Sequence, residues 1–436
     1  MQVLPEEFKI GLETFFTKGP GIFGRLRRSP EDFVVIERSK QFPRMEKGTV
    51  TVAQVTSVNW ETNHLVRELS NQLHISRKRV MFAGTKDKRA KTSQIMSFYN
   101  VRPEVLEKIS LKDVVISDVF VSDRMLKLGD LYGNHFEITI RDVADTVNSC
   151  SIDAIVSIIQ KYGGFPNFFG VQRFGIIRPL THIVGKHLVE GDFEKAVMTY
   201  LTDVSCYEDE IATQVRKQLL ETLDMKQAFH SFPDQLQFEK VMAQYLYEHP
   251  DDFVGALKSL PTSLLTMFVY AYQSFLFNRM LSDRIKKQLP LHQAVEGDVV
   301  LPVENGEISL REISVSSSNI DRVNEQLKRG RGFVSGVLIG SDSTYTKGKM
   351  GDIEQAVISE EGVDQRDFII PELPVASSYG TRRALLSPLS HFSYSIDTDD
   401  ANAEKKKVIV CFDLLKGCYA TSFLRELMKS DDIRKY

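Results

Sequence analysis

The sequence predicts a mixed α+β protein built from more than one domain. Its 436 residues exceed one ordinary domain, because domains usually hold about 100–200 residues each. Residues 135–141 alternate apolar and polar side chains, and residues 407–412 form a β-branched run, so strands are expected toward both ends of the chain. Residues 188–287 instead carry mostly helical periodicity. A helical middle between two similar ends indicates one domain inserted into another.

Local patterns predict the remaining elements. Aromatic and β-branched runs predict strands, apolar residues at helical spacing predict helices, and Gly163-Gly164 ends one helix. From 288 to 380 the chain becomes polar and strand-like, and residues 397–407 are expected to form a charged turn or loop. In chain order, these patterns predict a strand at 32–37, a helix at 63–73, a strand at 80–83, a helix at 151–162, a long helix at 262–281 and a helix at 422–429.

Composition and charge exclude several classes of protein. Hydrophobic residues make up 42% and charged residues 26% of the chain, which is typical of a packed globular protein and not of a disordered or fibrous one. No apolar run is long enough to span a membrane, and the N-terminus lacks the basic start and apolar run of a signal peptide, so we expect a cytoplasmic protein. Because the net charge is −3, any nucleic-acid site must be a local basic patch.

The usual signatures of metal and cofactor sites are absent from the sequence. There is no Walker loop, no HExxH and no GxSxG elbow, and Gly330–Gly332 is too short for a dinucleotide fingerprint. His182 and His187 are five residues apart and would lie on different faces of a helix. The four cysteines contain no CxxC, so we expect free thiols in a reducing compartment. The sequence therefore predicts neither a metal nor a nucleotide cofactor.

The densest basic segment covers residues 77–91. Seven of its fifteen residues are basic, and a single residue, Asp87, is acidic. As a charge run alone it would be interpreted as a solvated helix end followed by a turn. Cations on both sides of Asp87 favour its ionised form, and an ionised carboxylate in a basic loop suits a nucleophile or base acting on a polyanionic substrate. The neighbouring cations that would hold phosphates are Lys86, Lys88 and Arg89.

A second segment, residues 163–175, combines aromatic and polar residues between glycines. Three phenylalanines within residues 165–169 could simply belong to a core. Gly and Pro on either side predict a loop, however, and amides and a cation beside aromatic rings suit stacking on a base and reading its edge. A flipped base needs such a pocket. The candidate substrate-binding residues of this segment are Asn167, Phe169, Gln172 and Arg173.

Six motifs of the chain together resemble the TruD family of tRNA pseudouridine synthases. Residues 83–88, AGTKDK, and residues 167–175, NFFGVQRFG, look like the two main motifs of that family. The matches occur in the family's order, span residues 30–426, and look more like the archaeal or eukaryotic branch than the compact bacterial form. The other four matching segments are residues 30–37, 133–136, 272–278 and 417–426.

The resemblance implies a fold and a set of site residues. It implies a pseudouridine-synthase catalytic domain at 1–175 and 387–436, with mixed α/β structure around a bent antiparallel sheet, and an inserted α/β TRUD domain at 176–386. Asp87 falls on the family's catalytic aspartate, and Asn167 and Phe169 fall on active-site positions, where the Phe stacks on the target base. Arg27 falls where bacterial members have an active-site Lys; it keeps the charge but is a different kind of donor.

The activity implied by the resemblance is isomerisation of the uridine at position thirteen of tRNA to pseudouridine, with tRNA as the partner and without a cofactor. Asp87 would either attack the ribose C1′ or remove a ribose proton to give a glycal, and the sequence leaves both routes open. The resemblance implies no protein partner and no membrane contact, and we expect a monomer.

Two other functions fit parts of the sequence. The first is a non-catalytic protein that binds structured RNA on the same scaffold. Asp87 argues against it, because binding to a polyanion alone would favour a neutral residue at this position. The second is another RNA-modifying enzyme, such as a methyltransferase, but no glycine-rich cofactor turn follows a strand in this chain.

Overall fold

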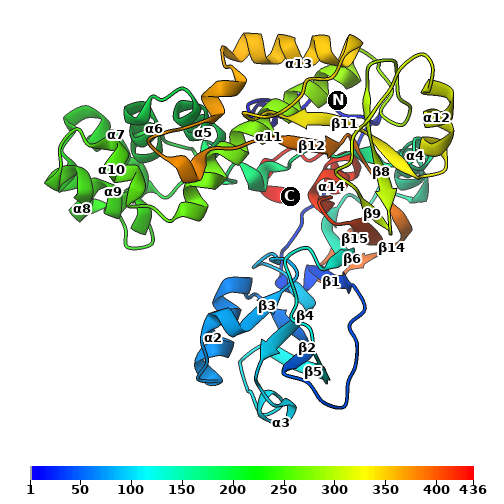
Figure 1. Cartoon of the computed structure of the whole chain (residues 1–436), viewed down its shortest axis with the longest axis horizontal. Coiled ribbons are helices and arrows are strands. Elements are labelled where there is room, and N and C mark those ends of the chain that lie inside the picture. Colours follow the sequence, from blue (N-terminus) through cyan, green and yellow to red (C-terminus); the bar gives the residue numbers. More distant parts are fainter. Residues whose placement is uncertain (1) are drawn as a thin grey trace. The chain divides into compact units, whose positions relative to one another are not determined.

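The computed structural model describes residues 2–436 and divides the chain into two compact units (Figure 1). The sheet unit comprises residues 17–165, 304–307 and 387–436. The helical unit comprises residues 166–303 and 308–386 together with the N-terminal residues up to Phe16. The chain is a mixture of helices and strands, as the sequence predicts.

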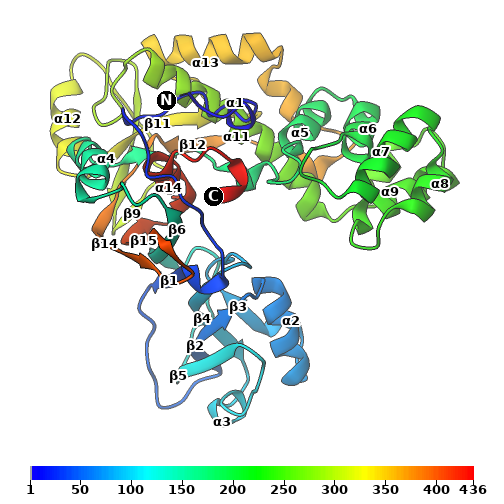
Figure 2. The same cartoon turned by 180° about the vertical axis from the view of Figure 1, so that it is seen from behind.

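The sheet unit is built on an eight-stranded sheet of order β14-β15-β6-β1-β4-β2-β5, with β3 paired to β4. β1 and β4 are parallel, and the other pairs are antiparallel. Neighbouring strands therefore come from both ends of the chain, as Figure 2 shows for β1, β6 and β15. The strands are β1 (Phe33–Ser39), β2 (Val50–Val58), β3 (Val80–Phe82), β4 (Lys91–Tyr99), β5 (Val114–Ser122), β6 (Leu131–Val143), β14 (Ser390–Asp399) and β15 (Asn402–Leu415).

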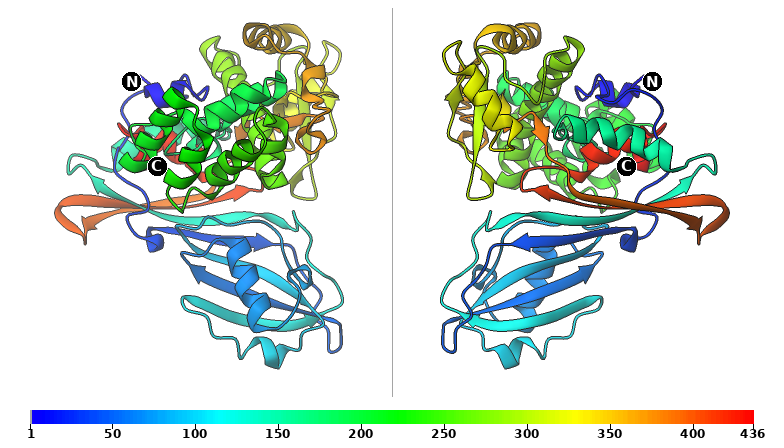
Figure 3. Two further views of the ribbon diagram at one scale, coloured as in Figure 1. Left: turned by 90° about the vertical axis from the view of Figure 1, so that its left-hand side faces the viewer. Right: turned by 90° about the vertical axis from the view of Figure 1, so that its right-hand side faces the viewer.

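The alternation predicted for residues 135–141 is confirmed in β6. Phe136, Ile138 and Ile140 are at most 7% exposed and join the core that α4 and α14 complete. A second core lies between α2 and strands β2 and β4, and Figure 3 shows α2 across one face of the blue and cyan strands. The helices of this unit are α2 (Thr62–Gln72), α3 (Pro103–Leu106), α4 (Ser149–Lys161) and α14 (Ala420–Met428).

The expectation of a charged turn or loop over residues 397–407 is wrong for most of that segment. Strand β14 continues to Asp399 and β15 begins at Asn402, so the turn is limited to residues 400–401. The charged side chains are compatible with a strand because opposite charges face each other across the hairpin. Asp397 pairs with Lys407 in the strand register.

The helical unit packs its helices around α11, the long helix predicted from residue 262 onward. Figure 1 shows the green helices α6–α10 gathered together, with α5 beside α11. Gly185 of α5 permits that contact, because a Cβ at this position would lie 2.0 Å from the Phe268 carbonyl oxygen of α11. The helices are α1 (Pro5–Phe8), α5 (Thr181–Val189), α6 (Phe193–Thr202), α7 (Glu210–Thr222), α8 (Met225–Ser231), α9 (Gln237–Glu248), α10 (Phe253–Lys258), α11 (Thr262–Lys286), α12 (Ile320–Lys328) and α13 (Gly348–Glu361).

The prediction of strand-like structure over residues 288–380 is partly wrong, because helices α12 and α13 lie within it. Met350, Ile353 and Val357 are buried at helical spacing in α13, a pattern hidden by the polar residues and glycines around it. The small sheet of this unit has the order β10-β8-β11-β12. Its strands are β8 (Val299–Glu304), β10 (Ile313–Ser314), β11 (Gly332–Leu338) and β12 (Thr381–Ala384); the two-residue strands β7 (Phe165–Pro166), β9 (Glu307–Ile308) and β13 (Leu386–Ser387) complete the chain.

His182 of α5 is buried in the helical unit, between the rings of Phe174 and Phe275. Its Nε2 lies 3.1 Å from the carbonyl oxygen of Lys9, which fits an Nε2–H donor of the neutral imidazole. Burial lowers the pKa of His182 from 6.5 to about 4. The folded protein therefore keeps this imidazole neutral, whereas the unfolded chain protonates it near its ordinary value.

We therefore expect stability to fall as the pH drops from about 6.5 to about 4. The unfolded chain binds a proton in this window that the folded chain does not, so the free energy of unfolding decreases, by up to roughly 3 kcal/mol from this residue. His182→Gln should flatten that part of the curve in urea denaturation measured at several pH values. His187→Gln, on the same helix, is the control. An unchanged pH dependence in His182→Gln would contradict the assignment.

Candidate active site

Asp87 lies in the loop between β3 and β4, where an arginine from a distant segment meets it. Arg27 Nη2 lies 2.6 Å from Asp87 Oδ2, in an ion pair whose arginine side chain is 11% exposed and whose aspartate side chain is 46% exposed. The Arg27 guanidinium also lies 4.1 Å from the centre of the Phe33 ring. Arg89 Nη2 donates to the Arg27 carbonyl oxygen at 3.1 Å. The structure thus brings together three of the residues predicted from sequence.

The position of Arg27 depends on an uncommon backbone conformation. Its φ is +54°, in the left-handed region, which costs a residue other than glycine of order 1–3 kcal/mol. The donation from Arg89 and the pair with Asp87 hold it there. A flat guanidinium can stack on Phe33 and donate to a carboxylate at the same time, which a lysine ammonium does less well. This geometry fits arginine, rather than lysine, at this position.

Lys86, predicted to hold phosphate, lies buried instead. Its ammonium is 2.6 Å from Glu37 Oε2 of β1, with side chains only 4% and 0% exposed. Its backbone N–H donates to Thr62 Oγ1 at 2.8 Å. These contacts favour a structural role in which Lys86 anchors the loop that carries Asp87, and its contact with substrate stays a prediction. Lys88 and Arg89, in contrast, are exposed.

Because the pair of Lys86 and Glu37 is buried, removing one partner should be more harmful than removing both. We expect Lys86→Met alone to lower the free energy of unfolding by roughly 3–5 kcal/mol, since it leaves an uncompensated buried carboxylate. The double change to methionine at both positions should cost less than the single change. Urea denaturation measures both, with Lys88→Met as the exposed control. A double variant that loses the sum of the two single effects would contradict the coupling.

Asn167 belongs to the helical unit, where its backbone and side-chain polar groups form hydrogen bonds with β12 and with Leu385, the residue after that strand. Its Nδ2 donates to the Ala384 carbonyl oxygen at 3.1 Å, and its backbone N–H donates to that of Leu385 at 2.8 Å. Arg383 donates to Asn167 twice, from Nη2 to Oδ1 at 2.6 Å and from Nε to the carbonyl oxygen at 3.0 Å. The residue is 2% exposed. Its geometry holds the segment in place, and substrate contact stays a prediction.

Hydrogen bonds fix the backbone of Phe169, and neighbouring side chains cover its ring. The Asn278 side chain of α11 accepts from the Phe169 N–H at 2.9 Å and donates to its carbonyl oxygen at 3.0 Å. The ring contacts Phe277 edge-on, with centres 5.7 Å apart, and the Arg383 guanidinium lies 4.1 Å from its centre. The residue is 4% exposed. Its ring face is therefore closed to a stacking base in this conformation.

The remaining predicted residues of this segment differ in exposure. Gln172 is exposed, whereas Arg173 is half-buried, donates to Ser274 Oγ at 3.2 Å and lies 5.5 Å from the centre of the Phe169 ring. Sequence reasoning missed Asn278 and Arg383. Asn278 ends the 272–278 motif, which pointed to its helix, whereas Arg383 had only the pair of arginines after Gly380 as a signal.

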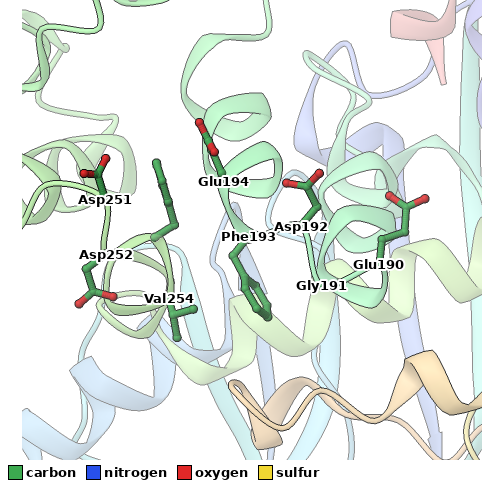
Figure 4. Close-up of a pocket in the computed structure, with 9 residues that line it drawn as sticks. Glu190, Gly191, Asp192, Phe193, Glu194, Asp251, Asp252 and Val254 are labelled. Carbon is green, nitrogen blue, oxygen red and sulfur yellow. The ribbon is translucent and has the colours of Figure 1, made fainter.

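A hollow of about 520 Å³ in the helical unit suits anions poorly. Figure 4 shows the carboxylates of Glu190, Asp192, Glu194, Asp251 and Asp252 along it. A hydrogen bond from Lys195 lowers the pKa of Asp192, and one from the Gly255 N–H lowers that of Asp252, so both are ionised at neutral pH. Fixed negative charge of this density repels phosphate. The predicted RNA-binding residues lie elsewhere.

Residues 2–436, which the structure describes, contain neither a candidate metal cluster nor a membrane-spanning helix. Within this range, no group of three or more His, Cys, Asp or Glu side chains is arranged to hold a metal ion. No helix described there is long and apolar enough to cross a membrane.

Comparison with protein families identifies the chain. The family model of tRNA pseudouridine synthase D (TruD) matches residues 9–427, nearly its whole length. The chain belongs to the TruD family. Both residue groups described above, around Asp87 and around Phe169, lie within the match, and the family is one of isomerases.

Several archaeal proteins are similar to the chain over its full length. It is 41% identical over 98% of both chains to a "probable tRNA pseudouridine synthase D" of Methanococcoides burtonii, and 40% identical over all of both chains to one of Methanosarcina barkeri. A crystal structure described as a TruD protein of Methanosarcina mazei has a TM-score of 0.87, 38% identity and full coverage of both chains. The sequence was expected to resemble the archaeal or eukaryotic branch more than the compact bacterial form, and these archaeal relatives agree with that expectation.

Proposed function

We propose that this protein isomerises a uridine of tRNA to pseudouridine, and that the target is the uridine at position thirteen. The observation that carries the proposal is the Asp87 carboxylate, half-exposed and held by Arg27 in a basic loop, in a chain of the TruD family. A fixed anion beside exposed cations suits attack on, or proton removal from, a ribose flanked by phosphates.

The proposed reaction needs no external reactant. The bond between uracil N1 and ribose C1′ breaks, the base rotates, C5 forms a bond to C1′, and the proton of C5 moves to N1. Asp87 either bonds to C1′ and is later displaced, or takes a ribose proton and returns it. In both routes the carboxylate must be anionic. The hydrogen bond from Arg27 Nη2 fixes the position of Oδ2.

Exposed cations next to Asp87 are proposed to hold the tRNA backbone. Lys88, Arg89 and Lys91 are exposed, and Arg89 also supports Arg27. The Arg79 guanidinium is already engaged within the protein, because it donates to the carbonyl oxygens of Tyr99 and Asn100. Lys88 and Lys91 are therefore the better candidates for phosphate contact.

The proposal assigns catalysis to residues 1–175 and 387–436 and the inserted TRUD domain to residues 176–386. The compact units overlap with this division but change over at Phe165/Pro166 and Leu386/Ser387, and they place the first sixteen residues with the helical unit. The domain borders therefore stay part of the proposal.

We expect Asp87→Asn to reduce conversion by several orders of magnitude. The amide is nearly isosteric but is neither an anionic nucleophile nor a base, so single-turnover release of tritium from tRNA labelled at uridine C5 should almost vanish. Affinity for tRNA should stay the same or rise, because a negative charge leaves a phosphate-binding loop. This pair of results also separates the enzyme from the alternative, a non-catalytic RNA-binding protein. Turnover near the parent rate would contradict the assignment of Asp87 as the catalytic carboxylate.

We also expect the combined change Lys88→Ala and Lys91→Ala to flatten the salt dependence of tRNA binding. Each lost phosphate contact should reduce the slope of log affinity against log salt by roughly 0.7–0.9, and all tRNAs should weaken alike. The matched control is Lys217→Ala with Lys226→Ala, which removes the same charge from exposed positions of α7 and α8. Equal slopes in the two double variants would place the phosphate contacts elsewhere.

A further inference from the structure

The space over the Phe169 ring is filled by a flat, hydrogen-bonding group of the protein itself. The Arg383 guanidinium lies 4.1 Å from the ring centre and 5.7 Å from the centre of Phe277. Nη2 and Nε donate in the same arrangement to Asn167 Oδ1 and its carbonyl oxygen. A planar donor that stacks on an aromatic face and bonds to acceptors at its edge has the recognition features of a nucleobase.

The orientation of the Asn167 amide is fixed independently of Arg383. Nδ2 donates to the Ala384 carbonyl oxygen at 3.1 Å, so Oδ1 is the atom turned toward Arg383. The Asn167 N–H bond to Leu385 and the clamp of Asn278 on the Phe169 backbone likewise do not involve Arg383. If the guanidinium left, an aromatic face and an amide acceptor would remain in place.

Uracil matches what would remain. Its ring stacks on an aromatic side chain, and its N3–H is a donor suited to the Asn167 oxygen. Cytosine carries a lone pair at N3, which an acceptor repels. An acceptor whose partner is missing in a buried site loses binding free energy, so this arrangement discriminates between the two bases.

We propose that the Arg383 guanidinium occupies the base subsite of the free protein. The target uracil replaces it over Phe169, the ring that the family resemblance already assigns to base stacking, and donates its N3–H to Asn167 Oδ1. The inference rests on the proposed function for the identity of the ligand. Arg383 can move because it is half-buried at the end of a long, flexible side chain. Phe169, only 4% exposed, can receive a base only if its cover moves.

The cover over the ring is tested without any RNA. Trp60 is the single tryptophan of the chain, so Trp60→Phe with Phe169→Trp gives a protein whose tryptophan fluorescence reports on position 169 alone. Adding Arg383→Ala should shift the emission to longer wavelength and increase quenching by acrylamide. The matched control is Arg279→Ala, which removes an arginine 6.0 Å from the Phe275 ring in the same unit. Identical spectra with and without Arg383 would overturn the proposal.

Recognition of the base is tested with tRNA transcripts bound to the Asp87→Asn protein. Cytidine or 3-methyluridine at the target position should weaken binding about tenfold or more relative to uridine, because neither offers an N3–H donor. Asn167→Leu should remove this preference. Arg383→Ala should keep the preference, and its affinity should stay the same or rise, since the uracil no longer has to displace the guanidinium.

Equal affinity for the three transcripts, or loss of binding in Arg383→Ala with a normal unfolding transition, would overturn the proposal. Its failure is distinguishable from failure of the proposed function, which is decided by turnover. The parent protein could convert uridine while the Asp87→Asn protein shows no base preference. In that case the proposed function stands and the proposed subsite is wrong. If the parent protein converts no uridine, the proposed function is wrong. The fluorescence result still decides whether Arg383 covers the Phe169 ring.

Discussion

The ion pair between Arg27 and Asp87 is the interaction on which the proposed chemistry depends. It joins residues 60 positions apart and fixes one oxygen of a carboxylate that is otherwise half-exposed. Each partner is in turn supported. Arg27 stacks on Phe33 and receives a hydrogen bond from Arg89, and the Asp87 loop is anchored by the buried pair of Lys86 and Glu37. The charge is thus held before a substrate arrives, which is what electrostatic preorganisation requires.

The helical unit holds an aromatic ring by similar means. Polar side chains bind the backbone on either side of Phe169, and Asn278 supplies both a donor and an acceptor for that purpose. Asn167 is tied to residues 384–385 in the same way. In the proposal, these fixed backbones surround one side chain that moves, Arg383, so that a stable site has an opening step. Rigid support of this kind keeps functional groups within the small tolerances that recognition and catalysis demand.

Local periodicity was enough to predict much of the fold, but it could not assign the roles of single charged or aromatic residues. Strand β6 and helices α4 and α11 follow from the spacing of their apolar residues, and the Asp87 loop follows from its motif. Lys86 looks in sequence like its exposed neighbours, and it turns inward only because Glu37, 49 residues earlier, lies beside it. The cover on Phe169 could not be foreseen either, since Asn167 and Arg383 are 216 residues apart.

Mapping the product on unmodified tRNA tests the central claim most directly. Purified protein is incubated with transcripts without additives, and pseudouridine is located by carbodiimide modification and primer extension. The account predicts one strong stop that assigns pseudouridine to position thirteen and that appears with the protein and not in its absence. Folded protein that binds the transcript and yet produces no pseudouridine would contradict the account. A stop at a different uridine would retain the chemistry and contradict the proposed target.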